Sequence, residues 1–320
     1  MIQDLQKHNF SYSSFILIGF PGFLEKRQLL FIPFCLLFIL AISSNSVIIH
    51  TIRTGHTLQS PMYILICTIA AVDLSIPMTF APKMLLAFLF DWNEISLIGC
   101  LVQMFFVHLT SSFQSTVTLI MAVDRYVAIC NPLRYNNYIN YSTLVKMSIA
   151  ALMRNGIFII IFTIPAGYLT FCMSNIIEHC YCDHMSLVSL ACEDTLKNNI
   201  MGLAAIFFIA GIDLIFIFFS YLKIFIVAHR TTSGKAREKA IHTCSTHLIV
   251  ILMVFAYITL LIGFYLPLEV RILLGAVYSI LPPLVHPIIY SLRTKEIKDF
   301  IVKRLKSKRQ ISLAVCICLK

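Results

Sequence analysis

A few titratable side chains stand within long apolar stretches of this chain, and they are its first candidates for chemistry. They include Asp73, His108, Arg154 and Asp213. Because an uncompensated charge is costly inside a membrane, we expect these side chains to face protein rather than lipid. A hydrolase would need a nucleophile with a base at the same depth. His108 has Ser111 and Ser112 nearby but no evident general-base partner, so we do not expect an enzyme.

The cysteines form a second reactive group. Four of them, Cys172, Cys180, Cys182 and Cys192, lie between two apolar stretches, and Cys100 stands at the start of another. Cysteines gathered on one face of a membrane protein indicate disulfides, because the outer face is the oxidising one.

The elements that must position these side chains follow from the composition. The chain has 320 residues, of which 59% are hydrophobic and 12% charged, and its mean hydropathy is +0.86. Soluble domains have about 25% charged residues, so a polytopic membrane protein is indicated. Seven stretches reach the roughly 20 apolar residues that a membrane helix needs. They are residues 28–52, 61–89, 97–130, 143–169, 200–228, 240–266 and 272–292.

We therefore predict an all-α membrane protein, a single seven-transmembrane domain over residues 1–320. Residues 1–27 would be extracellular and 293–320 a cytoplasmic tail. The tail begins with a short amphipathic helix, in which Ile297, Phe300, Ile301 and Leu305 share one face and basic residues the other.

The basic residues indicate the orientation. With the N-terminus outside, most of the 25 Lys and Arg residues fall on the cytoplasmic side, as in membrane proteins generally. The formal net charge of +10 then marks an inner face that meets membrane lipids, and nucleic acid is not expected as a partner. The sequon at Asn9 would be glycosylated outside, whereas the sequon at Asn140 falls in a cytoplasmic loop and would stay unused.

Several segments together resemble the odorant (olfactory) receptors, a branch of the rhodopsin-like (class A) G-protein-coupled receptors. The most specific are Met121–Tyr135 (MAVDRYVAICNPLRY) and Lys239–Leu248 (KAIHTCSTHL), supported by Pro61–Tyr63 (PMY) and Pro287–Arg293 (PIIYSLR). Asp213, where most rhodopsin-like receptors have proline, is similar to the class I, fish-like group.

The resemblance implies two disulfides, Cys100–Cys182 and Cys172–Cys192, which leave Cys180 over. It also implies a switch at the cytoplasmic end that meets a stimulatory olfactory G protein and raises cyclic AMP. The switch residues would be Asp73, Asp124, Arg125, Tyr126, Tyr221, His247, Pro287 and Tyr290. Gln114 and His286 replace residues of the family pattern around Asp73 and weaken oxygen coordination, so neither a metal nor a cofactor is expected.

The ligand would be a small odorant bound between the outer halves of the helices. Helical spacing from Cys100 points Met104, Phe105, His108, Ser111 and Ser112 inward, and family position adds Ile159, Phe162, Ala205, Phe208, Phe255, Thr259 and Ile262. Residues 255–266 hold no Arg or Lys, so we expect a neutral, apolar pocket rather than one for an acid.

Other membrane functions lack their required residues. Residues 272–292 contain no lysine for a retinal Schiff base, and residues 100–113 contain no acid for an amine ligand. The two halves show no internal repeat of a transporter, and the spans are too apolar for a channel. The alternative that remains is a receptor of the same family that acts outside the olfactory epithelium on a small metabolite.

Overall fold

Long helices form the body of the computed structural model, which describes residues 11–55, 57–231, 234, 267–294 and 296–304. Within that part of the chain, six helices are long and apolar enough to cross a membrane. They are α2 (Arg27–Thr54), α3 (Pro61–Phe90), α4 (Leu97–Cys130), α6 (Tyr141–Gly167), α11 (Leu268–Arg293) and a rod made of α8 (Leu196–Ile206), a π-helical turn (Phe207–Gly211) and α9 (Ile212–Thr231). The predicted span 240–266 lies outside the described residues.

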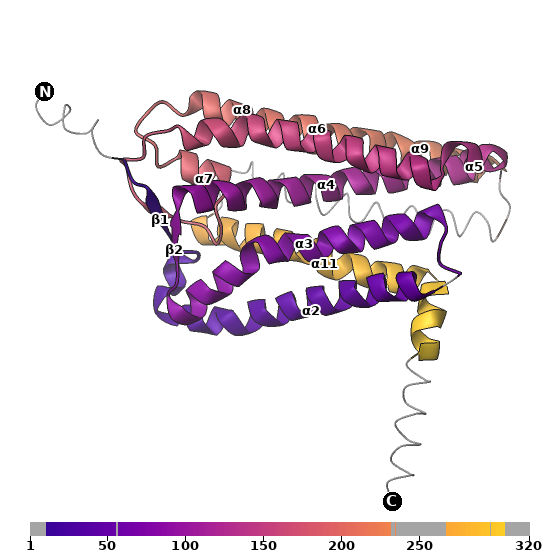
Figure 1. Cartoon of the computed structure of the whole chain (residues 1–320), viewed down its shortest axis with the longest axis horizontal. Helices are drawn as coiled ribbons and strands as arrows, with labels where there is room; N and C mark the ends of the chain where they lie inside the picture. Colours follow the sequence, from indigo (N-terminus) through magenta and orange to yellow (C-terminus); the bar gives the residue numbers. More distant parts are fainter. Residues whose placement is uncertain (1–10, 56, 232–233, 235–266, 295, 305–320) are drawn as a thin grey trace, which may run out of the picture.

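The helices run side by side as a bundle (Figure 1). Helix α4 packs against α3, α6 and α9, while α11 packs against α2 and α3. The largest core cluster joins α2, α3, α4 and α11, with Phe80 and Ile69 wholly buried. A central α4 therefore contacts most of the helices that could line a site.

Local signals in the sequence fix where these helices begin. Ser96 precedes α4 and its hydroxyl accepts a hydrogen bond from the Gly99 N–H at 3.1 Å, as an N-cap does. Asn140 caps α6 in the same way, through the Thr143 N–H at 3.0 Å. Helix α3 begins at Pro61, because proline has no N–H to lose in the first turn.

A small three-stranded sheet closes one end of the bundle, which the sequence pattern does not predict. Its strands are β1 (Ser14–Leu17), β2 (Glu94–Ser96) and β3 (Ile176–Ile177), in the order β2-β1-β3. Strand β1 runs antiparallel to β2 and parallel to β3. Phe15 of β1 is wholly buried and meets Phe171 edge-on, with 5.1 Å between ring centroids.

Short helices occupy both ends. At the end with the sheet, η2 (Pro21–Lys26) leads into α2, and α7 (His184–Val188) lies in the loop before α8. This end also carries both disulfides, and we call it the disulfide end. At the opposite end, η3 (Pro132–Arg134) and α5 (Tyr135–Tyr138) join α4 to α6. We call it the basic end, since Arg53, Lys146 and Lys223 are exposed there.

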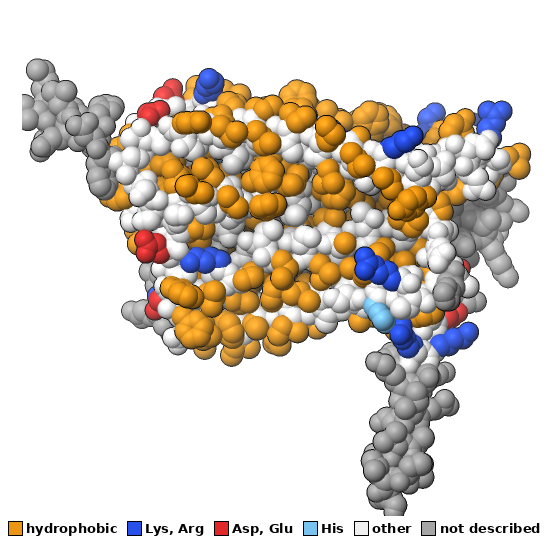
Figure 2. Space-filling view, in the orientation of Figure 1, with side chains coloured by type: hydrophobic (Ala, Val, Ile, Leu, Met, Phe, Trp, Pro, Cys, Tyr) orange, Lys and Arg blue, Asp and Glu red, His pale blue; other side chains and the backbone are white. Residues whose placement is uncertain are grey.

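The flank of the bundle is apolar. Figure 2 shows hydrophobic side chains over most of the flank, with most acidic side chains toward the disulfide end and most basic ones toward the basic end. Leu36, Ile157 and Phe216 are each more than half exposed. Exposed apolar surface of this extent is a surface for lipid.

The segment after α11 is also helical. Residues 296–304 form a helix in which Ile297 is buried against the core, while Lys298 and Lys303 are exposed. The Arg304 guanidinium donates to the Thr54 hydroxyl at 2.9 Å, which ties this helix to the end of α2. The predicted amphipathic arrangement is therefore present over the described residues.

Candidate ligand and coupling sites

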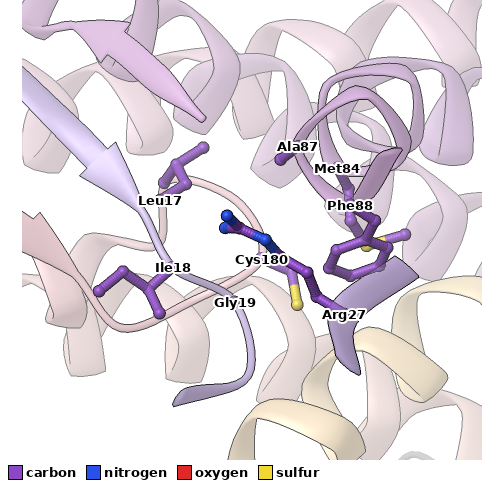
Figure 3. A pocket seen from close by; sticks show the side chains of 8 residues that line it. All are labelled: Leu17, Ile18, Gly19, Arg27, Met84, Ala87, Phe88 and Cys180. Carbon is purple, nitrogen blue, oxygen red and sulfur yellow. The ribbon is translucent and has the colours of Figure 1, made fainter. Parts of the chain in front are cut away.

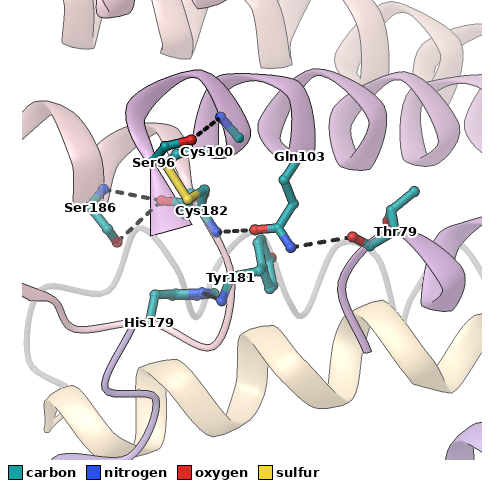
Figure 4. The surroundings of a disulfide bond; sticks show 10 residues. Thr79, Ser96, Cys100, Gln103, His179, Tyr181, Cys182 and Ser186 are labelled. Carbon is teal, nitrogen blue, oxygen red and sulfur yellow. Dashed lines mark hydrogen bonds between the residues drawn. A yellow bond between two sulfur atoms is a disulfide. The ribbon is translucent and has the colours of Figure 1, made fainter. Parts of the chain in front are cut away.

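The loop between α6 and α8 is fixed over the disulfide end. Cys182 is joined to Cys100 of α4, with 5.3 Å between their Cα atoms, and Cys172 is joined to Cys192 at 5.5 Å. Gln103 of α4 strengthens the first attachment (Figure 4): its side-chain carbonyl accepts from the Cys182 N–H at 2.9 Å, and its amide donates to the Thr79 carbonyl at 3.3 Å. The loop thus has a set position relative to α3 and α4.

Where this loop meets the helices, two histidines contact one phenylalanine. Phe162 of α6 meets His108 of α4 edge-on at 5.3 Å and His184 of α7 at 5.1 Å. Gly202 of α8 approaches His184 so closely that a Cβ there would lie 2.9 Å from its Nδ1. Helices α4, α6, α7 and α8 therefore converge on this place, which we call the histidine cluster.

Several buried polar atoms at the histidine cluster have no hydrogen-bond partner within the described part of the chain. They are His108 Nε2, both ring nitrogens of His184 and, on α8 one turn before Gly202, Asn198 Nδ2. The Phe162 backbone lies near the His184 ring without forming a well-aligned hydrogen bond. An unsatisfied buried polar group costs about 1–3 kcal/mol, so these atoms are the candidates for hydrogen bonds to a ligand.

The charge state of the cluster follows from its burial. Burial lowers the pKa of His184 to about 4, so this imidazole is neutral at pH 7. Burial opposes ionisation of the neighbouring Asp183, but His179 and the Ser186 N–H hold the pKa of that carboxyl below its usual value. Asp183 is also the N-cap of α7, and its carboxylate accepts from the Met185 N–H at 3.1 Å. The cluster can therefore offer neutral nitrogens as donors or acceptors, and it presents no fixed cation among its described residues.

The structure brings some of the predicted ligand residues together at this place. Ile159, Phe162 and Ala205 form one buried cluster with Ile209, and Phe105 packs against it. Met104 is wholly buried in a different cluster, beneath the sheet with Phe15 and Phe171. Ser111 is half-buried, and the Ser112 hydroxyl donates to the Leu109 carbonyl at 3.0 Å. Phe255, Thr259 and Ile262 lie outside the described residues.

The position of Phe208 differs from the prediction. Its ring is 47% exposed on the flank and stacks on Phe158, with 6.0 Å between centroids. The reason is the π-helical turn Phe207–Gly211, which inserts a residue relative to an α-helix and changes which side chains face inward. Ile209, not Phe208, takes the inward position.

A small recess, separate from the histidine cluster, lies at the disulfide end (Figure 3). It lies where β1 and the start of α2 meet the end of α3, and is lined by Leu17, Ile18, Gly19, Arg27, Met84, Ala87, Phe88 and Cys180. It is smaller than the roughly 300–1,000 Å³ of ordinary small-molecule sites. Arg27 pairs with Asp91 beside it, and burial raises the pKa of the Cys180 thiol well above its usual value, so this thiol is not a nucleophile at neutral pH.

In the middle of the bundle, Asp73 is wholly buried and joins three helices. Its carboxylate accepts from the Gln114 amide of α4 at 2.5 Å and lies 2.9 Å from His286 Nδ1 of α11. The two residues that depart from the family pattern are thus both partners of Asp73. Among the described residues, no group of three His, Cys, Asp or Glu side chains converges as a metal site would.

The predicted switch residues lie at the basic end. The Asp124 carboxylate accepts from the Tyr135 hydroxyl of α5 at 2.6 Å, and the Arg125 guanidinium contacts Met62 Sδ of α3. Burial and the hydrogen bond to Asp124 raise the pKa of Tyr135, which therefore stays protonated and able to donate. Arg125 is consequently held by α3, while its acidic neighbour is held by α5.

The other switch residues surround this pair. Tyr221 is buried against Ala122, Ile217 and Ile224, and Tyr126 packs on the same cluster. The Tyr290 hydroxyl donates to Met121 Sδ at 3.7 Å, and Pro287 lies within α11 one turn before it. His247 lies outside the described residues.

Comparison with known proteins decides the family. The family model for olfactory receptors matches residues 34–308. The chain is 38% identical over 303 residues to olfactory receptor 51E2 of Mus musculus, covering 93% of this chain and 95% of that protein. It is 37% identical over 300 residues to olfactory receptor 52P1 of Homo sapiens, covering 92% and 94% respectively. The chain belongs to the olfactory receptor family.

Membership sets the class of this olfactory receptor. It is a class A G-protein-coupled receptor with a seven-helix bundle, a multi-pass membrane protein and not an enzyme. The resemblance seen in its sequence strings is thereby confirmed.

Two residues of the olfactory receptor's histidine cluster were missing from the sequence prediction. Asn198 is four residues before Gly202, on the buried face of α8. His184 lies in a loop whose position depends on the disulfide two residues before it, and no periodicity points to it.

Proposed function

We propose that the chain is an odorant receptor whose ligand binds at the histidine cluster. The observation that carries this proposal is the set of unsatisfied polar atoms on His108, His184 and Asn198. They lie in an otherwise apolar setting formed by Phe162, Ile159 and Ala205. A small, largely apolar molecule with one or two hydrogen-bonding groups fits this chemistry, and a neutral odorant fits it better than an acid.

The proposal includes an orientation and a G-protein partner. Disulfides form on the oxidising side of a membrane, which supports an extracellular disulfide end and N-terminus. Exposed basic residues at the opposite end support a cytoplasmic location for Arg125, Tyr126 and Tyr221. Odorant binding would then favour the state in which Arg125 leaves Met62 and meets a stimulatory G protein, raising cyclic AMP. The whole of residues 1–320 acts in this proposal as one receptor domain in the plasma membrane.

The test is a cyclic AMP reporter cell that displays the chain and is exposed to a panel of small odorants. For any odorant that activates it, Asn198→Leu removes one unsatisfied amide with little change in shape. The loss of one hydrogen bond to the ligand, about 0.5–1.5 kcal/mol, should reduce potency by roughly 2- to 12-fold without loss of surface expression. Asn199→Leu is the matched control, since Asn199 is only half-buried and lies next to Thr195.

Other outcomes are equally informative. Unchanged potency in Asn198→Leu, and likewise in His184→Phe, would show that the ligand binds elsewhere. A response to a metabolite but to no odorant would favour the receptor that acts outside the olfactory epithelium.

A further inference from the structure

A network built on an ion pair joins three helices midway along the bundle. The Arg154 guanidinium of α6 meets the Asp213 carboxylate of α9 with both of its terminal nitrogens, at 2.9 and 3.0 Å. This two-pronged geometry fixes direction as well as distance, because guanidinium and carboxylate are both planar.

Two further side chains complete the arrangement. The Thr116 hydroxyl of α4 donates to Asp213 at 2.9 Å and accepts from Arg154 at 2.8 Å. Arg154 Nε donates to the Asn155 side-chain carbonyl at 3.0 Å, and the Asn155 amide donates to Thr116 at 3.2 Å. Asp213 and Asn155 are wholly buried, whereas the Arg154 side chain is 30% exposed.

The network lies midway along its helices, where buried charges are costly. Arg154 is the middle residue of the 27-residue α6, so it lies about 20 Å from either end of the helix at 1.5 Å per residue. Asp213 is likewise near the middle of the rod 196–231. Buried ion pairs are often no more stable than apolar residues of the same size. Stability alone therefore gives little reason for charges at this depth, and their directional geometry gives a better one.

The geometry matters for the rotation of the rod. Its buried face recurs every four residues, at Ala205, Ile209, Asp213, Ile217 and Tyr221. Four residues of a regular α-helix turn through about 400°, which is about 40° more than a full circle. A face that recurs every four residues would therefore rotate gradually away from α4. The π-helical turn Phe207–Gly211 takes up an extra residue and returns the face toward α4.

Asp213 occupies the middle of that face. Ala205 and Ile209, toward the disulfide end, belong to the cluster beside Phe162. Ile217 and Tyr221, toward the basic end, belong to the cluster beside Ala122. A single anchored residue therefore stands between the candidate ligand site and the candidate switch on one rigid element.

We infer that Arg154 and Asp213 are positioning residues, which set the rotation of α9 against α4 and α6 and so couple the histidine cluster to Tyr221. This inference deepens the proposed function and rests on it for its signalling readout.

The experiment uses the full chain, purified in lipid nanodiscs, with spin labels at Lys146→Cys and Lys223→Cys and the other free cysteines replaced by serine. Both positions are exposed at the basic end, one on α6 and one on α9. The distance distribution between the labels is compared in wild type, in Arg154→Lys and in the apolar pair Arg154→Met with Asp213→Leu. Melting temperature and basal cyclic AMP per surface receptor are measured on the same variants without labels.

We expect the apolar pair to melt close to wild type but to lose the narrow wild-type distance maximum. Basal cyclic AMP should change by about fivefold or more, as for a coupling free energy of 1 kcal/mol. Arg154→Lys keeps the positive charge but loses the two-nitrogen geometry of the guanidinium, so it should also broaden the distance distribution. Lys83→Gln, which alters a charge of α3 outside this network, is the control and should leave the distribution unchanged.

A wild-type distribution in both the apolar pair and Arg154→Lys would overturn the inference, because the pair would then serve stability alone. If wild type itself raises no cyclic AMP under any condition, the proposed function fails. The spin-label comparison still decides the inference in that case, since it needs no signalling.

Discussion

Single side chains at the histidine cluster give the molecule a defined pH dependence. His184 is 4% exposed, and burial lowers its pKa from an ordinary 6.5 to about 4. Between these values the unfolded chain binds a proton that the folded chain does not, so folding weakens as pH falls from about 6.5 to about 4. The full loss from this residue is roughly 3 kcal/mol.

The measurement is the melting temperature of the purified receptor at pH 7 and pH 5. His184→Phe should lose less stability over this interval than wild type, because it has no proton to bind. Asp183 does not interfere, since the pKa of its carboxyl is below 3.8 and it stays ionised throughout. Burial also lowers the pKa of His179, so part of the pH dependence should remain in the variant. An equal loss in both proteins would contradict the assignment to His184.

At the basic end, Arg125 carries the proposed signal. Arg125→Ala should abolish cyclic AMP signalling while surface expression stays near wild type, because the side-chain hydrogen-bonding contact that it loses among the described residues is the half-buried one to Met62. Arg134→Ala is the matched control, since Arg134 is exposed on the neighbouring loop. Full signalling by Arg125→Ala at equal surface level would exclude the proposed role.

The two charges at the bundle centre should respond unequally to neutralisation. Asp213→Asn leaves Arg154 charged at any pH, about 20 Å from water along the helix, and arginine cannot shed its proton. Arg154→Gln leaves a carboxyl group that can take up a proton and still bond to Thr116. Surface expression should therefore fall further in Asp213→Asn than in Arg154→Gln, as flow cytometry would show. The reverse order would mean that arginine finds another partner there.

At the scale of elements, strand β1 attaches the N-terminal segment to both neighbouring loops. Phe15 is its wholly buried anchor, so Phe15→Ala should cost about 3–5 kcal/mol at the disulfide end. The control is Phe90→Ala, because Phe90 is 67% exposed. Melting curves of the two variants should separate clearly, and similar curves would show that the sheet adds little to stability.

The elements also show which features a sequence can predict. The long helices follow from apolar length and from caps such as Ser96 and Asn140, which are local properties. The sheet could not be predicted, because strands of two to four residues carry almost no periodic signal. Phe208 was misplaced because regular helical spacing does not anticipate a π-helical turn.

The site residues divide in the same way. Asp73, Arg154 and Asp213 are recognisable because charges are rare in apolar stretches. The pairing of Arg154 with Asp213 cannot be recognised from the sequence, since the two residues are 59 positions apart and meet only when two helices adopt particular rotations. His184 joins the cluster only through the loop that Cys182 anchors, a tertiary effect without a local pattern.

For the molecule as a whole, charge, cysteines and sequons imply one orientation, which can be tested directly. Asn9, outside the described residues, should carry a glycan, so removal of N-glycans or Asn9→Gln should lower the apparent mass equally. Asn140→Gln should leave the mass unchanged, because the Asn140 side chain caps α6 at the basic end, on the proposed cytoplasmic side. An epitope tag before Asn9 should be stained on intact cells, whereas one after Lys320 should need permeabilised cells. Staining of the second tag on intact cells would reverse the orientation, and with it the assignment of the basic end to the G protein.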